Sequence, residues 1–133
     1  MGIREIIFRG KSKRNGEWVY GGIWTAIYYN DNNREVAIVL NGLSREIVDT
    51  STVGQYTGFK DKNGTKIFEG DIVKGSWNTK IVIYFDEDYL QFRGREISAY
   101  ARENYIGYYD NGKMEVIGNI YDNPELLDVQ NSN

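Results

Sequence analysis

The sequence predicts a mostly β protein with one or two short helices, and three observations lead to that fold class. Tyrosine and the other aromatic residues make up 14% of the chain, and such side chains favour half-buried strand surfaces. Runs of β-branched and aromatic residues recur along the chain. Four Asn-Gly pairs, which suit the positive φ angles of tight hairpin turns, separate these runs: Asn15-Gly16, Asn41-Gly42, Asn63-Gly64 and Asn111-Gly112.

The predicted strands lie on both sides of these turns. A segment rich in isoleucine, valine and aromatic residues, 80–85, is expected to pair with 89–93 across the acidic turn 86–88. The other expected strands are 3–9, 17–29, 36–40, 65–68 and 113–117.

Two segments predict helix. In 96–105 the apolar residues Ile97, Tyr100, Ala101 and Tyr105 follow helical spacing. A second helical turn is expected at Pro124, with Asn123 as its N-cap and with the two following leucines docked inward.

The composition excludes several classes of site. The chain has 133 residues, no cysteine and no histidine, which removes disulfides, thiol nucleophiles, imidazole bases and Cys/His zinc sites. The net charge of −3 gives no general attraction to nucleic acid. No apolar run reaches the length of a membrane span, and the N-terminus lacks a signal peptide's apolar stretch. We therefore expect a cytoplasmic protein that is not an enzyme and needs no cofactor or metal.

Residues 52–73, which read TVGQYTGFKDKNGTKIFEGDIV, resemble the signature of the YopX family of phage and prophage proteins. The N-terminal blocks 4–11 and 16–21 are similar to the family's opening, and 115–127 is similar to its ending. The resemblance implies an SH3-like small barrel in the C-terminal part and a phage-derived gene expressed in a bacterial cytoplasm. It implies no established activity and no catalytic residue.

The expected organisation follows from these two sources. An N-terminal β-meander, residues 1–50, packs with an SH3-like small barrel, residues 51–127, and a frayed tail follows at 128–133. The boundary is placed at the polar stretch 49–52, since the single proline leaves no proline-rich linker.

One candidate interaction surface is aromatic. Trp77, Tyr84 and Tyr89 fall in or beside the predicted hairpin of 80–93. Strand alternation puts Tyr84 on the face opposite Ile81 and Ile83, so one face is core and the other is a second core or a contact surface. SH3-like barrels bind peptides on aromatic-lined grooves, which makes these three residues the predicted partner-binding site. Core packing explains the aromatic residues about as well.

A second candidate surface is basic. Arg9, Lys11, Lys13 and Arg14 precede Trp18, and cations interleaved with aromatic rings can hold phosphates and stack bases. The alternative, which the shortness of the cluster favours, is a charged hairpin tip that protects an edge strand from aggregation.

Acidic patterns give weaker signals. The run 86–88 is expected to be a solvated hairpin tip, since consecutive strand residues point to opposite faces. A calcium loop starting at Asp61 fails at its sixth and twelfth positions, where Lys66 and Ile72 stand. The pair Glu69 and Asp71 shares a strand face but lacks the cleft that carboxylate catalysis needs.

These observations give two functional hypotheses. The first is a non-enzymatic protein-interaction module that acts on a phage or host protein. The alternative is a nucleic-acid-binding accessory protein that uses the basic N-terminal hairpin. A homo-oligomer is also expected, because an open meander would expose strand edges and because tyrosine-rich surfaces often pair with a second copy.

Overall fold

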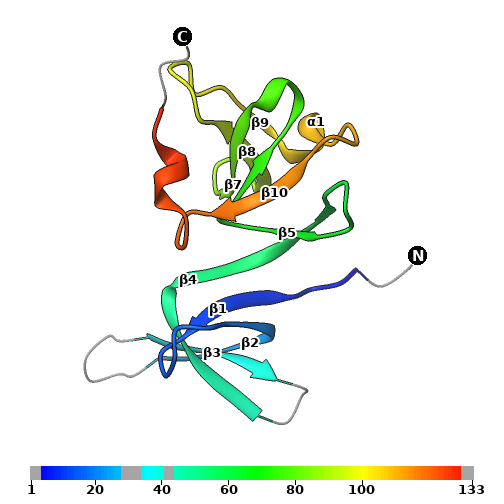
Figure 1. Cartoon of the computed structure of the whole chain (residues 1–133). Helices are drawn as coiled ribbons and strands as arrows, with labels where there is room; N and C mark the ends of the chain where they lie inside the picture. The colour runs from blue at the N-terminus through cyan, green and yellow to red at the C-terminus, as the bar shows by residue number, and fades with distance from the viewer. Residues whose placement is uncertain (1–3, 28–33, 41–43, 130–133) are drawn as a thin grey trace. The chain divides into compact units, whose positions relative to one another are not determined.

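The computed structural model describes residues 4–27, 34–40 and 44–129, and it confirms the all-β prediction. The strands form two antiparallel five-stranded sheets, accompanied by three helical turns (Figure 1). The chain divides into two compact units, residues 1–56 and 57–133, which are described separately below.

Four strands build the first unit. β1 pairs with β2, β2 with β3, and β3 with β4, as a meander requires. β1 also pairs with β4, from Phe8 opposite Gln55 to Ser12 opposite Val48, with a bulge between Arg9 and Lys11. This fourth pairing closes the ring. The strands are β1 (Phe8–Ser12), β2 (Trp18–Ile27), β3 (Arg34–Leu40) and β4 (Ser44–Lys60).

Closure corrects one expectation from the sequence. The open meander would have left β1 and β4 as free edges, but each hydrogen-bonds to the other. Self-association by pairing of those two edges therefore loses its basis, and a homo-oligomer stays a prediction. The Asn15-Gly16 turn joins β1 to β2 as predicted, with Gly16 at φ 73°. The Asn41-Gly42 turn lies outside the described residues.

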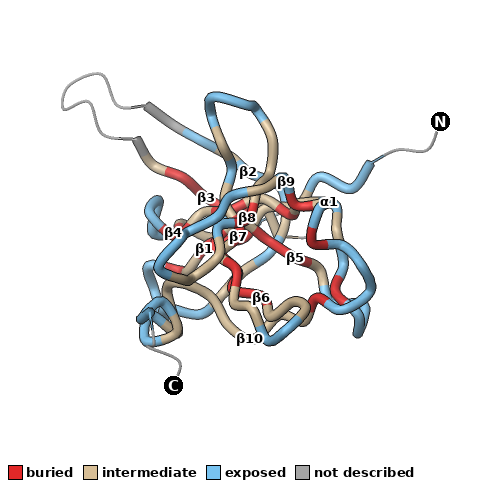
Figure 2. Tube along the Cα trace, turned by 90° about the horizontal axis from the view of Figure 1, so that it is seen from above, coloured by how far each residue is buried: buried red, intermediate tan, exposed pale blue. Residues whose placement is uncertain are grey.

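A small aliphatic core fills the first unit. Val36, Ile38 and Val48 are buried at its centre, and Phe8 and Val19 pack against them among other partly buried side chains. Gly10 allows this closure, because a Cβ there would lie 2.9 Å from Cγ2 of Val48. The buried positions of this unit lie within strands, and residues 13–17, which form the described turn between β1 and β2, are exposed (Figure 2).

The second unit contains the other sheet. Its strands run in the order β10-β6-β7-β8-β9, all antiparallel. A short strand, β5, pairs with the end of β4 in the other sheet. The strands are β5 (Lys66–Phe68), β6 (Asp71–Lys74), β7 (Lys80–Asp86), β8 (Gln91–Glu96), β9 (Glu103–Tyr105) and β10 (Glu115–Asn119).

The core of the second unit lies on one face of this sheet. Its centre includes Ile81 and Ile83 of β7, which are 1% and 0% exposed. The other buried members are Ile67, Val73, Ile106, Tyr109 and Met114. Phe59, Phe92 and Val116 pack around them.

Asp61 connects the β4–β5 turn to β10. Its Oδ1 accepts hydrogen bonds from the amides of Asn63 and Thr65, each at 2.9 Å, and its Oδ2 accepts one from the amide of Val116 at 3.0 Å. Burial alone would raise the pKa of this carboxyl, but the three amides outweigh burial and lower the pKa from its ordinary value of 3.8. The segment that fails as a calcium loop is thus a hairpin turn, with Gly64 at φ 82°.

The predicted helix over 96–105 is wrong. Glu96 ends β8, and residues 103–105 form β9, which pairs with β8 from Arg95 opposite Glu103 to Arg93 opposite Tyr105. The pairing overrides the helical spacing of the apolar residues, because tertiary contacts outweigh weak local preference. The helix α1 (Ile106–Tyr109) begins just after the predicted segment.

The helical turn at Pro124 is confirmed as η2 (Pro124–Leu127). Asn123 precedes it, but its Oδ1 accepts a hydrogen bond from the amide of Asn119 and caps no helix amide. Leu127 is 38% exposed and does not dock inward as expected. Of the predicted frayed tail, residues 130–133 lie outside the described residues.

The predicted domain boundary at 49–52 lies inside β4, which runs unbroken from Ser44 to Lys60. Its polar residues belong to an irregular stretch of the β1–β4 pairing. There the hydroxyl of Thr52 accepts a hydrogen bond from the amide of Lys11 at 2.9 Å and donates one to the carbonyl of Asp49 at 2.6 Å.

Candidate functional site

The outer face of β7 and β8 carries a set of tyrosine and arginine side chains. Because side chains alternate along a strand, the burial of Ile81 and Ile83 places Val82 and Tyr84 on the opposite face. The register then sets Tyr84 opposite Arg93 and Val82 opposite Arg95. Two arginines therefore lie beside Tyr84 on the face that the core does not use.

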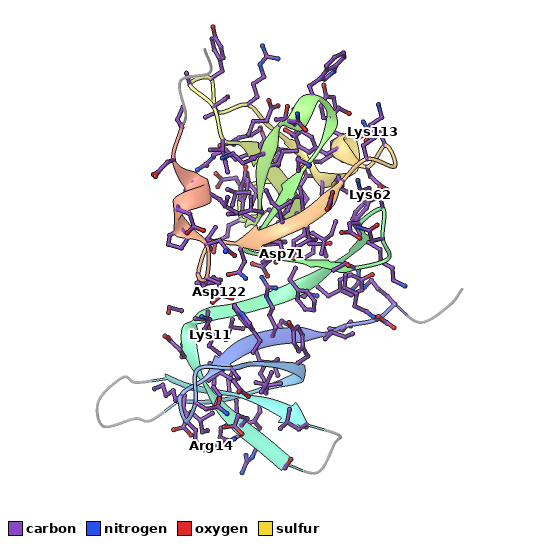
Figure 3. All side chains as sticks on the ribbon, in the orientation of Figure 1. Lys11, Arg14, Lys62, Asp71, Lys113 and Asp122 are labelled. Atoms are coloured by element: carbon purple, nitrogen blue, oxygen red, sulfur yellow. The ribbon has the colours of Figure 1, made fainter. Side chains whose placement is uncertain are left out.

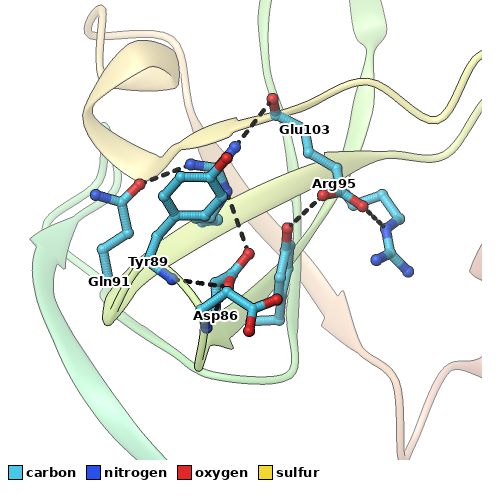
Figure 4. Close-up of polar contacts among 8 residues, drawn as sticks. Asp86, Tyr89, Gln91, Arg95 and Glu103 are labelled. Atoms are coloured by element: carbon cyan, nitrogen blue, oxygen red, sulfur yellow. Dashed lines mark hydrogen bonds and ion pairs between the residues drawn. The ribbon is translucent and has the colours of Figure 1, made fainter.

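Tyr84, Arg95 and Glu103 form one connected group (Figure 4). The Tyr84 hydroxyl donates a hydrogen bond to Oε2 of Glu103 at 3.0 Å, and Nε of Arg95 donates one to Oε1 at 2.7 Å. The Arg95 guanidinium carbon lies 5.2 Å from the centre of the Tyr84 ring. Three adjacent strands, β7, β8 and β9, thus hold one side chain each in a fixed arrangement.

Arg93 joins the same face to the β7–β8 turn. Its Nη1 donates a hydrogen bond to Oε1 of Gln91 at 2.7 Å, and its Nε lies 3.6 Å from Oδ2 of Asp86, which makes an ion pair without a hydrogen bond. Its guanidinium carbon is 4.6 Å from the centre of the Tyr89 ring. Asp86 also accepts the amides of Asp88 and Tyr89, so the acidic run forms a hairpin turn as predicted (Figure 4).

The electrostatics of this group hold it in one charge state near neutral pH. Hydrogen bonds from Arg95 and then from Tyr84 lower the pKa of Glu103. Burial, and then the hydrogen bond to Glu103, raise the pKa of Tyr84. Both shifts move away from neutral pH, so the phenol stays protonated and the carboxylate stays ionised. A general acid or base that works near neutrality needs shifts in the other direction.

An apolar groove of about 370 Å³ borders this group. Tyr84 and Arg95 lie on its wall, and the segment after β8 and the C-terminal part of the chain supply most of the rest. Its apolar lining consists of Val82, Ile97, Ala101, Ile120, Leu127 and Val129. Known ligand pockets have volumes of roughly 300–1,000 Å³ and a similar mixture of apolar walls and a few polar groups.

The structure does not bring the three predicted partner-binding residues together. Tyr84 lies at the centre of the outer face. Trp77, which is 97% exposed, lies in the turn before β7, and Tyr89, which is 68% exposed, follows the end of β7. A seven-residue strand separates the last two by roughly 20 Å.

The basic residues of the N-terminal hairpin make contacts within the first unit. Arg9 is 5% exposed, and its guanidinium carbon lies 4.5 Å from the centre of the Trp18 ring. Nζ of Lys11 lies 5.4 Å from the same ring. Arg14 and Lys11 are labelled in Figure 3. Nε of Arg14 is 3.3 Å from Oε2 of Glu46, and Lys13 is exposed. In this hairpin Arg9 and Lys11 thus lie over the Trp18 ring, and Arg14 pairs with the Glu46 carboxylate.

Sequence reasoning missed the groove and its arginines. The alternating pair Arg93 and Arg95, with one glycine between them, carried a signal, since residues two apart on a strand share a face. The C-terminal wall of the groove carried no such signal in the sequence, because Leu127 and Val129 are placed there by the fold and not by a local pattern. Among the described residues, no group of three or more His, Cys, Asp or Glu side chains could hold a metal ion.

Comparison with known proteins adds a family to this geometry. Residues 7–128 match the family model described as YopX protein, which covers most of the chain. The chain belongs to the YopX family. The family assignment confirms the resemblance carried by residues 52–73 and by the N-terminal and C-terminal blocks, and it brings no functional residue with it.

A solved structure shares the fold of this YopX protein. The crystal structure of protein EF1440 from Enterococcus faecalis is similar, with a TM-score of 0.52 and 22% sequence identity, over 93% of this chain and 99% of that chain. None of the curated proteins compared matches. Within the described part of the chain, no helix is long and apolar enough to cross a membrane.

Proposed function

We propose that this YopX protein is a non-enzymatic, phage-type accessory protein of the bacterial cytoplasm that acts as a protein-interaction module. The groove beside Tyr84 and Arg95 carries this proposal. It takes an apolar side chain from an extended segment of a phage or host protein, while the tyrosine and the arginine contact the flanking backbone. Tyrosine and arginine are enriched among residues that dominate binding energy at protein interfaces.

The charge of the second unit supports a protein partner over a nucleic acid. Residues 57–133 contain thirteen Asp and Glu side chains against nine Lys and Arg. A net-acidic body repels phosphates, whereas nucleic-acid affinity depends on phosphate contacts. The occupant that fits best is thus a neutral or basic polypeptide segment with one apolar anchor.

Selection from a displayed random-peptide library, followed by calorimetry on the synthetic peptides, tests this proposal. We expect the selected peptides to share one large apolar residue. Leu127→Asp places a charge in the groove, and because Leu127 is partly exposed the fold should tolerate it. This variant should weaken peptide binding at least tenfold.

The matched control is Lys13→Ser with Arg14→Ser, which removes two cations outside the groove and should leave peptide affinity unchanged. The proposal fails if Leu127→Asp binds the peptides as tightly as the wild type. It also fails if no peptide is selected while a salt-sensitive gel shift with nucleic acid disappears in the control variant, because that result would assign binding to the basic hairpin.

A further inference from the structure

A second cavity, of about 380 Å³, lies at the end of β8, and its wall is mostly polar. The turn before β7, the end of β8 and α1 surround it. Arg95 and Glu96 are neighbours on β8 and therefore point to opposite faces of the sheet. Arg95 borders the apolar groove on the outer face, and the Glu96 carboxylate contacts Tyr109 on the core side. Glu96 also lines the apolar groove, but every other residue of the cavity wall differs from those of the groove, so the cavity is a second hollow that meets the groove of the proposed function at this one side chain.

An exposed tryptophan in a strained turn stands at this cavity. Trp77 has φ 60° and ψ 28°, Asn78 has φ 58°, and the amide of Thr79 donates to the carbonyl of Ser76 at 3.1 Å. These values are those of a type I′ turn, whose two central positions favour Asn and Gly. A bulky residue with positive φ is an outlier that costs free energy.

Burial of the indole within the chain does not offset this cost, because Trp77 is 97% exposed. The turn is nevertheless held in place, since Nδ2 of Asn111 donates a hydrogen bond to the Ser76 hydroxyl at 2.9 Å. Local backbone strain of this kind is found at binding sites, where it fixes a side chain for a ligand. The geometry therefore positions an unburied indole at the mouth of a polar cavity.

The Glu96 carboxylate borders this cavity and forms no ion pair with a described lysine or arginine side chain. The side chain is half-buried, and its Oε2 accepts a hydrogen bond from the Tyr109 hydroxyl at 3.2 Å. Glu46, Glu103 and Glu115 each pair with an arginine or a lysine, but none of the described Lys or Arg side chains lies within ion-pair distance of Glu96. A partly desolvated carboxylate gains most from a cation that a ligand brings.

We propose that this cavity binds an organic cation, that is, a guanidinium or a primary ammonium group. The Glu96 carboxylate is its counter-ion. The rings of Trp77 and Tyr108, which is 61% exposed, flank the cation, and aromatic faces attract cations, with tryptophan the strongest. The net-acidic second unit adds attraction at longer range.

Arg102 allows a test of whether the ligand is a cation or an anion. It also borders the cavity, but its guanidinium carbon lies 5.8 Å from the Tyr100 ring centre and the side chain is exposed, so solvent screens its charge. A cationic ligand should bind more tightly when Arg102 is neutralised and less tightly when Glu96 is neutralised. An anionic ligand would respond in the opposite way to both changes.

The experiment is an amide NMR titration of the full chain with N-acetyl-L-arginine amide and with spermidine, against N-acetyl-L-leucine amide as the neutral control. We expect millimolar binding of a cation, with shifts at residues 75–79, 96 and 108. Glu96→Gln should weaken binding at least fivefold, and Arg102→Gln should strengthen it a few-fold. Tighter binding of the arginine derivative indicates a protein side chain as the natural source, and tighter binding of spermidine indicates a free polyamine.

Trp77→Asn separates binding from folding. Asparagine suits the first central position of a type I′ turn, so this variant should raise Tm by roughly 2–5 °C while weakening cation binding at least threefold. The proposal is overturned if neither cation binds better than the leucine derivative, or if Arg102→Gln weakens binding. It is equally overturned if Trp77→Asn binds cations like the wild type.

Discussion

The two units of this protein use arginine and aromatic side chains in opposite ways. In the first unit Arg9 is buried and stacks on Trp18, and both belong to strands of a sheet that closes on itself. In the second unit Arg93 and Arg95 lie over Tyr89 and Tyr84 on a sheet face that the core leaves uncovered. The same pair of residue types thus lies in a buried position where the sheet closes and on the outer face where the sheet stays open.

The largest expected effect distinguishes the two faces of β7. Ile83 is fully buried, and Ile83→Ala should lower the free energy of unfolding by about 2–5 kcal/mol, because it removes packed methyl groups and leaves a cavity. Its neighbour Tyr84 is the matched control, and Tyr84→Ala should cost about 1 kcal/mol or less, since this ring is partly exposed. Urea denaturation measures both. Equal losses would mean that the outer face is a second core.

The next effect compares the two arginine environments. Arg9→Ala should cost about 2–3 kcal/mol, because it removes a buried stem and a stacked cation together. Arg95→Ala should cost under about 1 kcal/mol, since that side chain is 55% exposed. Thermal denaturation of the two variants measures the two losses of stability. If Arg9→Ala costs less than about 1 kcal/mol, the stacked arginine contributes little to the stability of the first unit.

A third prediction concerns the link that joins the β4–β5 turn to β10. Asp61→Asn should cost about 1–2 kcal/mol at neutral pH, because the amide accepts hydrogen bonds through only one oxygen. The pKa of Asp61 is lowered in the folded state, so its contribution is complete above pH 3.8 and is lost as pH falls through the folded pKa.

The measurement is chemical denaturation of both proteins between pH 2 and pH 7. The difference between wild type and Asp61→Asn should be constant above about pH 5 and should shrink toward zero in acid. A difference that persists at pH 2 would show that the hydrogen bonds do not depend on the ionised carboxylate.

The smallest effect is the coupling between Arg95 and Glu103. Both side chains are partly exposed, at 55% and 36%, so a double-mutant cycle with alanine at each position should give a coupling energy of about 0.2–1 kcal/mol. Raising the salt concentration should reduce it. A coupling well above this range would mean that the outer face contributes to the stability of the second unit.

Strand content and two of the four predicted Asn-Gly hairpin turns were predictable because they depend on local chemistry, whereas Asn111-Gly112 joins α1 to β10 and no pair of strands. Asn15-Gly16 and Asn63-Gly64 favour tight turns wherever they occur, and the β-branched run at 80–85 favours a strand. The closure of β1 on β4 was not predictable, since it depends on a pairing between residues about forty positions apart. The false helix at 96–105 has a different cause, because there a more local pairing, that of β9 with β8, outweighs the helical spacing of the apolar residues.

The candidate site was predictable only in part, for a related reason. Tyr84 was found from strand alternation, but Trp77 and Tyr89 were grouped with it by closeness in sequence, and the strand between them holds them apart. The groove depends on where the C-terminal segment passes, which no local pattern of Leu127 or Val129 reveals.

The continuity of β4 limits how relatives of this chain can exchange parts. Its first portion pairs with β1 and β3, and its last residues pair with β5, so the two units meet inside a strand and not in a loop. A recombination event between the units would have to preserve the strand register on both sides of the junction. A shift of one residue would turn every following side chain to the wrong face, so such hybrids should fold only when the junction keeps its length.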